Sequence, residues 1–172
     1  MPASFIPALH SQFDAAIQML DNAIDACPDH LWSDQERRPE FWYLVFHTLF
    51  FLDYYLADPA VAFEPPAPFT RGELDPSGVM PERIYSRAEM REYLEHGRQR
   101  CRRVLAEMTG ESAHEPCGFP RKTMSRFELH IYNLRHVQHH AAQLNFILRQ
   151  RTDSAPGWVS GAAHALLPEP PA

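Results

Sequence analysis

Apolar residues recur every three or four positions in four separate stretches of this sequence. Such spacing keeps apolar side chains on one face of an α-helix, which completes a turn every ~3.6 residues. Leu and Ala together number 36, whereas Val and Ile number 12, and this balance favours helices over strands. We therefore predict an all-α protein, a four-helix bundle with helices over residues 5–26, 40–57, 86–109 and 125–151.

Two of the expected helices begin with a capping-box pattern. Ser86 and Ser125 are each followed three residues later by a glutamate, Glu89 and Glu128. In a capping box the serine hydroxyl accepts from the glutamate backbone N–H, and the glutamate carboxylate accepts from the serine backbone N–H. Pro39 precedes the second helix, where a missing backbone N–H has little effect. These signals define where three of the four helices begin.

The segment from Asp58 to Tyr85 contains six prolines and shows no helical periodicity. A connection of this length without secondary structure is uncommon inside a compact domain and typically serves as a crossover, a lid or a binding loop. The other connections are short, which favours antiparallel neighbours, while the long one allows the second and third helices to run parallel. We expect one bundle domain over residues 1–152 and a Pro- and Ala-rich tail over residues 153–172.

The charge distribution argues against several classes of function. The formal net charge is −6, and the first 36 residues contain no Lys or Arg. A nucleic-acid partner is therefore not expected, and the basic start of a secretory signal is missing. The one long apolar stretch, Phe41 to Ala57, is interrupted by His47 and Asp53, so we expect no membrane span and no membrane partner. These features predict a soluble, cytoplasmic protein.

The sequence also lacks the motifs of several enzyme classes. The three cysteines are widely spaced and form no CxxC pair, which predicts buried thiols rather than a disulfide framework or a cysteine zinc site. The His114-Glu115 pair is followed at once by Pro116, so the HExxH motif of zinc proteases is absent. A glycine-rich phosphate loop and a GxSxG elbow are absent too, which argues against P-loop phosphoryl transfer and serine hydrolysis.

Three of the ten histidines stand within predicted helices among apolar neighbours. His136 and His140 are one helical turn apart, so both imidazoles can point toward one ion, and His47 lies midway along the central apolar helix. His139 falls among polar residues and should face solvent. For any single histidine, a hydrogen-bonded core position or a surface position is the more ordinary explanation. Three of them on helices that should pack together predict a shared metal site.

A site of three neutral imidazoles suits a divalent metal ion, foremost Zn²⁺ or Ni²⁺, with Fe²⁺, Mn²⁺ or Cu²⁺ as alternatives. Three protein ligands leave the remaining positions to water or substrate, and such an open site implies Lewis-acid chemistry. Metal-bound histidines usually donate their second ring N–H to an oxygen. Glu40, Asp53 and Gln143 are the candidate acceptors, and the sequence does not rank them.

Two segments carry these histidines, Phe-His47-Thr-Leu-Phe-Phe-Leu-Asp-Tyr-Tyr and Arg135-His136-Val-Gln-His-His140-Ala-Ala-Gln143-Leu. Both resemble the DinB/YfiT-like superfamily of small four-helix bundles, whose members have a crossover between the second and third helices and are often dimeric. The resemblance implies that His47, His136 and His140 are the ligands of a divalent metal. Characterised relatives include metal-dependent transferases that use low-molecular-weight thiols, and thiol-dependent isomerases. The resemblance therefore implies a small-molecule substrate and a role for such a thiol.

Two functions of different classes are compatible with these features. In the first, the chain is a metal enzyme of the thiol-dependent transferase or hydrolase type, whose ion activates a thiol or water. Tyr54, seven residues after His47 and on nearly the same helix face, or a bound water is the expected proton carrier, and core packing is the alternative explanation for Tyr54. In the second, the bundle is non-catalytic, its metal site is structural or vestigial, and it acts through partner binding. A fourth protein ligand would favour the second function, and exchangeable water the first.

Aromatic residues occur on nearly every side of the second helix, more than three neighbouring helices usually cover. We expect the segment from Asp58 to Tyr85 to fold back over the bundle and close one side of the metal pocket. We also expect a homodimer to bury much of the remainder. The apolar side chains of the segment that could provide this cover are Val61, Phe63, Phe69 and Met80.

Overall fold

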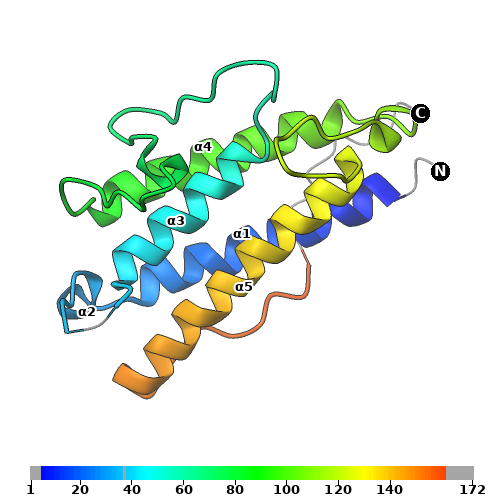
Figure 1. Ribbon diagram of the computed structural model, residues 1–172. Coiled ribbons are helices and arrows are strands. Elements are labelled where there is room, and N and C mark those ends of the chain that lie inside the picture. The colour runs from blue at the N-terminus through cyan, green and yellow to red at the C-terminus, as the bar shows by residue number, and fades with distance from the viewer. Residues whose placement is uncertain (1–4, 37, 162–172) are drawn as a thin grey trace.

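The computed structural model describes residues 5–36 and 38–161, and every regular element among them is a helix or a 3₁₀ turn. Four long helices form the bundle, and the shorter elements lie in the connections (Figure 1). The only β-type pairing among these residues is an isolated bridge between Pro116 and Ser125, which confirms the all-α prediction. In chain order the elements are α1 (Phe5–Ala26), α2 (Asp29–Trp32), α3 (Phe41–Tyr54), η1 (Gly72–Leu74), α4 (Arg87–Ala106), η2 (Ser112–His114) and α5 (Arg126–Thr152).

The helices are arranged as the connection lengths predict. α1 and α3 run in opposite directions, α3 and α4 run in the same direction, and α5 runs back (Figure 1). α1 packs against α4 and α5, and α3 packs against the same two helices. The long connection between α3 and α4 is the crossover that a parallel pair requires. The four-helix bundle is therefore confirmed, and α3 lies beside α5, the two helices that carry the candidate metal ligands.

The helix boundaries agree with the prediction to within three residues. Ser86 forms the complete capping box with Glu89. Ser125 accepts a hydrogen bond from the backbone N–H of Glu128 at 3.2 Å, but among the described residues the return bond from the Glu128 carboxylate is not formed. The second capping box is thus only half correct. α3 ends at Tyr54, because just after it the backbone N–H groups bond carbonyls three residues back and tighten the last turn.

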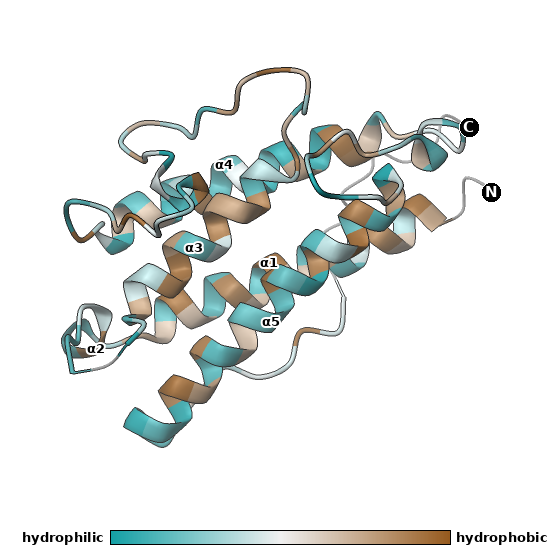
Figure 2. Ribbon diagram, viewed as in Figure 1, coloured by the Kyte–Doolittle hydropathy of each residue, from teal (hydrophilic) through white to brown (hydrophobic). Residues whose placement is uncertain are grey.

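α3 lies at the centre of the core. Many of its residues are hydrophobic (Figure 2), and its aromatic side chains are buried or half-buried by the other helices and the crossover. Coverage of these side chains therefore needs no second chain, and the homodimer stays a prediction. The aromatic residues concerned are Phe41, Trp42, Tyr43, Phe46, Phe50, Phe51, Tyr54 and, just after the helix, Tyr55.

Two aromatic side chains fix the crossover to the bundle. Phe69 stacks on Tyr93 of α4 with ring centroids 4.3 Å apart, and Phe63 packs edge-on against α3. Val61 and Met80 remain 65% and 47% exposed, so the prediction that they cover the bundle is wrong. The backbone N–H of Val61 closes a turn onto the carbonyl of Asp58, and a second turn, from Asp75 to Gly78, ends two residues before Met80. Both side chains lie at these surface turns, whereas the two phenylalanines are buried.

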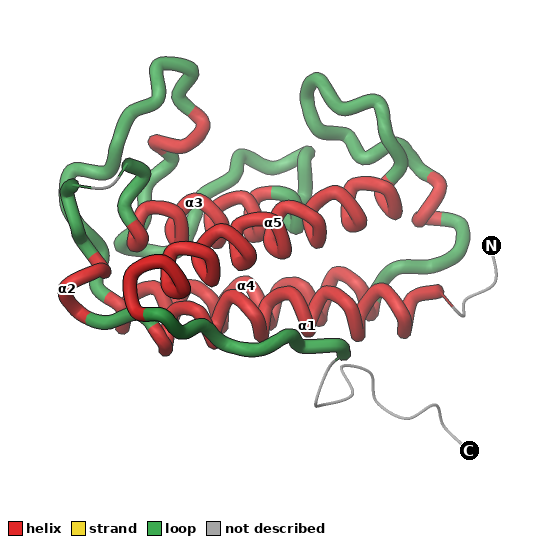
Figure 3. Tube along the Cα trace, turned by 90° about the horizontal axis from the view of Figure 1, so that it is seen from below, coloured by secondary structure: helices red, strands yellow, loops and turns green. Residues whose placement is uncertain are grey.

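The chain after α5 runs back along the bundle (Figure 3). Ala155 and Val159 pack against the core, and the Gln12 side chain donates to the carbonyl of Ser160 at 3.2 Å. The rest of the predicted tail, residues 162–172, lies outside the described residues. Among the helices that are described, none combines the length and the apolar character needed to cross a membrane.

Candidate metal centre

Two neighbouring helices bring three histidines together. His47 lies in the middle of α3, and His136 and His140 are one turn apart on α5. The Nε2 atom of His136 lies 3.3 Å from Nε2 of His47 and 3.1 Å from Nε2 of His140. Ligand atoms from all three residues lie within 4.8 Å of one another. These residues, hereafter the three-His group, could hold a metal ion.

The spacing of the nitrogens fits a shared ion. Two imidazole nitrogens bound to one divalent ion at about 2.0–2.1 Å lie roughly 3.0–3.4 Å apart in octahedral or tetrahedral geometry. The two separations of 3.1 and 3.3 Å fall within this range. Two of the three pairs of ring nitrogens therefore have the spacing of metal ligands, and all three ligand atoms lie within 4.8 Å of one another.

Glu73, in the crossover, is the hydrogen-bond partner of His47. Its Oε2 atom lies 2.6 Å from Nδ1 of His47, and burial together with the nearby Glu73 carboxylate raises the pKa of the Tyr43 hydroxyl. The Glu73 side chain is only 5% exposed, although it comes from a surface connection. It is placed by η1, where the chain folds tightly, because a Cβ atom on Gly72 would lie 3.0 Å from the carbonyl oxygen of Val79. The carboxylate keeps the proton of His47 on Nδ1 and leaves Nε2 free.

Gln143 has the same function for His140. Its Oε1 atom lies 2.7 Å from Nδ1 of His140, and because an amide oxygen only accepts, Nδ1 carries the proton. The Nε2 atoms of His47 and His140 therefore both present lone pairs toward Nε2 of His136. A cation placed between these rings could accept both lone pairs. Nδ1 of His136 is buried and has no hydrogen-bond partner in the described part of the chain.

Burial keeps two of the imidazoles uncharged. Desolvation, reinforced by the neighbouring imidazoles of His140 and His47, lowers the pKa of His136 to about 3. Desolvation likewise lowers the pKa of His140 to about 4. Because a metal ion binds the neutral form of imidazole, protons compete little for these two side chains near neutral pH.

Comparison with models of known protein families shows to which family the chain belongs. The family model described as the DinB superfamily matches residues 12–144, which include the whole three-His group and most of the bundle. The chain belongs to the DinB superfamily. Neither the curated proteins nor the solved structures give a significant match. The DinB assignment and the helical bundle both agree with the resemblance seen in the sequence.

One side of the three-His group in this DinB-superfamily chain is accessible. A groove of about 580 Å³ reaches His140 along the surface between the start of α3 and α5. The ring of Phe51 covers another side, with its centroid 4.9 Å from that of His47 and 5.6 Å from that of His136. A small molecule can therefore approach from the groove, which is lined by Pro39, Leu44, His139, His140, Ala142, Gln143 and Phe146.

The other predicted residues have different surroundings. His139 is exposed and is not part of the three-His group, as predicted. Tyr54 packs among the rings of Phe50, Phe63 and Phe119. Its part as a proton carrier stays a prediction.

Only one of the three candidate hydrogen-bond acceptors, Gln143, bonds a histidine of the group. Asp53 is fully buried and its Oδ1 accepts from Nη1 of Arg100 at 2.5 Å, so it joins α3 to α4. Glu40 accepts from the indole N–H of Trp42 at 2.6 Å. Both carboxylates therefore form polar contacts elsewhere in the bundle and not with the three-His group.

Glu73 and Tyr43 were not predicted from the sequence as residues near the three-His group. Glu73 lies in a segment without helical periodicity. The sequence feature that could have indicated its role is a carboxylate next to a glycine, Gly72, in a proline-rich connection. Tyr43 precedes His47 by four residues and so shares its helix face, which is the stronger signal. Through the contact of Glu73 with His47, the crossover of this DinB-superfamily chain is linked to the candidate metal centre.

Proposed function

We propose that this chain is a metal-dependent enzyme of the thiol-transferase or hydrolase type, acting on an electrophilic small molecule at the three-His group. The observation that carries the proposal is the convergence of three Nε2 atoms with no fourth His, Cys, Asp or Glu in the group, among the residues described. Structural zinc sites are closed by four protein ligands, whereas catalytic sites keep a position open. We propose Zn²⁺ or Ni²⁺ as the resident ion.

The chain's own side chains prepare the site. Glu73 and Gln143 accept hydrogen bonds from Nδ1 of His47 and His140, so both rings are held with Nε2 unprotonated and directed at one point. A carboxylate partner also makes an imidazole more basic, and such partners typically change metal affinity by about 10–100-fold. When bound, a divalent ion supplies Lewis acidity that lowers the pKa of a coordinated thiol or water.

The groove beside His140 supports a small-molecule substrate. Leu44 and Phe146 provide apolar surface there, and the Phe146 side chain is 56% exposed. A volume of about 580 Å³ lies within the range of ~300–1,000 Å³ that is usual for ligand sites. An electrophile with an apolar part would lie in this groove with its reactive atom near the three-His group.

Cobalt substitution tests whether the site keeps an open position for a thiol. The full chain is stripped with a chelator, loaded with one equivalent of Co²⁺, and its absorption spectrum is recorded with and without 2-mercaptoethanol. We expect a new sulfur-to-cobalt charge-transfer band in the native chain and none in His136→Gln. Cobalt that stays bound with an unchanged spectrum would instead show a closed, structural site.

An activity assay tests the reaction class. The consumption of several low-molecular-weight thiols in the presence of 1-chloro-2,4-dinitrobenzene is followed for chelated and for zinc- or nickel-loaded protein. We expect the loaded protein to accelerate the reaction with at least one thiol, and His136→Gln to lose that acceleration. His114→Gln, which changes an exposed histidine of η2, is the matched control and should retain it. Equal rates for chelated and loaded protein would contradict the proposal.

A further inference from the structure

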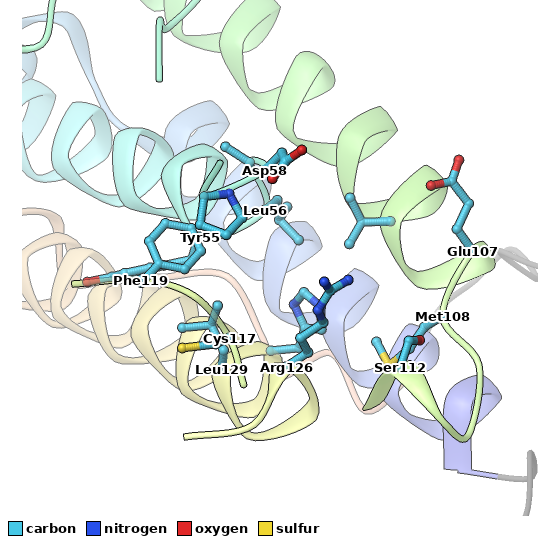
Figure 4. Close-up of a pocket in the computed structure, with 14 residues that line it drawn as sticks. Tyr55, Leu56, Asp58, Glu107, Met108, Ser112, Cys117, Phe119, Arg126 and Leu129 are labelled. Carbon is cyan, nitrogen blue, oxygen red and sulfur yellow. The ribbon is translucent and has the colours of Figure 1, made fainter. Parts of the chain in front are cut away.

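The groove beside His140 differs in its charge from other cavities of the protein. Among the described residues, its lining contains no Asp, Glu, Lys or Arg. Three other cavities each have at least one carboxylate and at least one guanidinium group in their lining. One of them, of about 360 Å³ and lined in part by His130, lies near the start of α5, and Figure 4 shows Asp58, Glu107 and Arg126 around it. The uncharged lining is therefore a property of the groove and not of every cavity in this protein.

The lining of the groove determines the charge of a molecule that can bind there. A charged group loses hydration when it enters an apolar groove, and this cost is offset only where an opposite charge meets it. The described lining offers no carboxylate, ammonium or guanidinium group as such a partner. An uncharged molecule avoids this cost, and the groove therefore favours one.

Gln143 places a hydrogen-bond donor in the groove. Its Oε1 atom lies 2.7 Å from Nδ1 of His140, and this contact fixes which end of the side-chain amide faces the histidine. The NH₂ group of the same amide donates to no described residue, although Gln143 lines the groove. An amide NH₂ group has two N–H donors, so it can bind an acceptor oxygen. The contact that orients His140 thus leaves a donor available to a molecule in the groove.

Phe146 provides the aromatic surface of the groove. It follows Gln143 by three residues, so the two side chains share one face of α5. Phe146 is 56% exposed, whereas Leu44, which α3 contributes to the same lining, is buried. Aromatic rings attract one another in offset-stacked or edge-to-face contacts, and the accessible ring of Phe146 can make such a contact with a bound aryl group.

We propose that the groove beside His140 selects an uncharged aromatic electrophile that carries an acceptor oxygen, with its ring on Phe146 and its oxygen at the amide of Gln143. Phe146 is then a specificity-determining residue, because it contacts a part of the substrate that does not react. The volume of about 580 Å³ is sufficient for a molecule of this size. The inference rests on the proposed function, which makes the bound molecule a substrate, but the binding itself needs no metal ion.

Four small probes of nearly the same shape test the selection. Nitrobenzene is uncharged, benzoate is its anionic isostere, benzamidinium is its cationic isostere, and toluene has no acceptor oxygen. Each is titrated into the chelated, ¹⁵N-labelled full chain at pH 8, above the pKa of about 6.5 of a free imidazole. The Kd is taken from the NMR shift of the Gln143 backbone amide, so that binding at the charged cavities is not counted.

Nitrobenzene should bind best. We expect its Kd in the millimolar range or tighter, with benzoate and benzamidinium at least about tenfold weaker because their charge meets no partner. Toluene should bind about threefold more weakly, because it cannot accept a hydrogen bond. Equal or tighter binding of either charged probe or of toluene, or no binding of nitrobenzene up to about 10 mM, would overturn the proposal.

Substitutions in the groove locate the contacts. Phe146→Ala should weaken nitrobenzene binding about three- to tenfold, because the aromatic contact is lost. Ile131→Ala, at a 38% exposed position of the same helix outside the groove lining, is the matched control and should leave Kd unchanged. Ala142→Lys places a cation at an exposed position of the groove and should make benzoate bind more tightly than nitrobenzene. An unchanged Kd in Phe146→Ala, or an unchanged order of the probes in Ala142→Lys, would contradict the proposal.

Turnover separates this inference from the proposed function. 1-Chloro-2,4-dinitrobenzene is uncharged, and 4-chloro-3,5-dinitrobenzoate undergoes the same reaction but carries a carboxylate. In both, the thiolate sulfur bonds to the ring carbon and chloride leaves with the electron pair. With metal-loaded protein, we expect the larger acceleration over the uncatalysed rate for the uncharged compound, and in Phe146→Ala a higher KM with little change in kcat. Equal acceleration of both compounds would contradict the inference and support the proposed function. No acceleration of either, with the titrations as expected, would contradict the proposed function and leave the selection of uncharged molecules supported.

Discussion

Nδ1 of His47 lies 2.6 Å from Oε2 of Glu73, so a residue of the crossover holds a metal-ligand candidate of the central helix. The bond joins segments 26 residues apart in sequence, and the same carboxylate, with burial, raises the pKa of the Tyr43 hydroxyl. The crossover therefore contributes a residue to the candidate metal centre as well as connecting α3 and α4.

Replacing Glu73 should weaken metal binding without unfolding the bundle. In Glu73→Gln, His47 loses the anionic partner that orients its ring, and zinc affinity should fall by about 10–100-fold. Competition with a chromophoric chelator measures the change. Glu64→Gln, an exposed position of the same crossover, is the control. An affinity in Glu73→Gln equal to that of the native chain would show that Glu73 does not support His47.

The aromatic contact that docks the crossover should contribute to stability. Phe69 is buried against Tyr93, so Phe69→Ala should lower the free energy of unfolding by about 3 kcal/mol through lost contacts and a residual cavity. Urea unfolding followed by circular dichroism gives the value. Val61→Ala, at a 65% exposed position of the same segment, should change it by less than about 0.5 kcal/mol. Similar values for the two variants would indicate that the crossover is not docked as described.

Asp53 should matter for stability and not for metal binding. Its carboxylate is fully buried and contacts the half-buried Arg100, with His96 Nε2 at 3.2 Å, so Asp53→Asn leaves a half-buried cation poorly paired. We expect a loss of about 3 kcal/mol in the free energy of unfolding, with zinc affinity unchanged within twofold. Asp25→Asn breaks an exposed ion pair with Arg91 and should cost less than about 1 kcal/mol. A large change in zinc affinity would contradict the placement of Asp53 outside the metal centre.

Acidification should destabilise the fold through His130. Its pKa is about 4 in the folded chain and about 6.5 when unfolded, so below pH 6.5 the unfolded chain takes up a proton that the folded chain does not. The contribution of neutral His130 to the free energy of unfolding is therefore fully present above pH 6.5. It is lost as pH falls toward 4, and this loss amounts to up to about 3 kcal/mol. Urea unfolding at pH 7 and pH 5 should show a smaller loss in His130→Gln than in the native chain. Identical losses would show that His130 is not the group responsible.

The helices and the three histidines could be predicted because both follow from local spacing. The apolar period of α1, α3, α4 and α5 is set by 3.6 residues per turn, and the i, i+4 spacing places His136 and His140 on one face wherever α5 packs. His47 joined them by a weaker argument, since nothing local specifies which face of an almost wholly apolar helix meets α5. The expectation that the two helices pack together led to that choice, and the resemblance to a known family supported it.

The crossover could not be predicted in the same way. Its conformation depends on contacts with the bundle, such as Phe69 on Tyr93, and on turns that leave Val61 and Met80 exposed while equally apolar neighbours are buried. Glu73 reaches His47 only because of that tertiary arrangement. The cavity near His130 likewise depends on how the connection between α4 and α5 folds against two helix ends.

The central claim is that His47, His136 and His140 hold one divalent ion and leave it a free position. Anomalous diffraction at the zinc edge, from crystals of the zinc-loaded full chain, measures this directly. We predict a single peak about 2.0–2.2 Å from Nε2 of each of the three histidines, with the remaining coordination supplied by water or another small molecule. A peak at any other place in the chain, or an ion closed by a fourth protein side chain, would contradict the account.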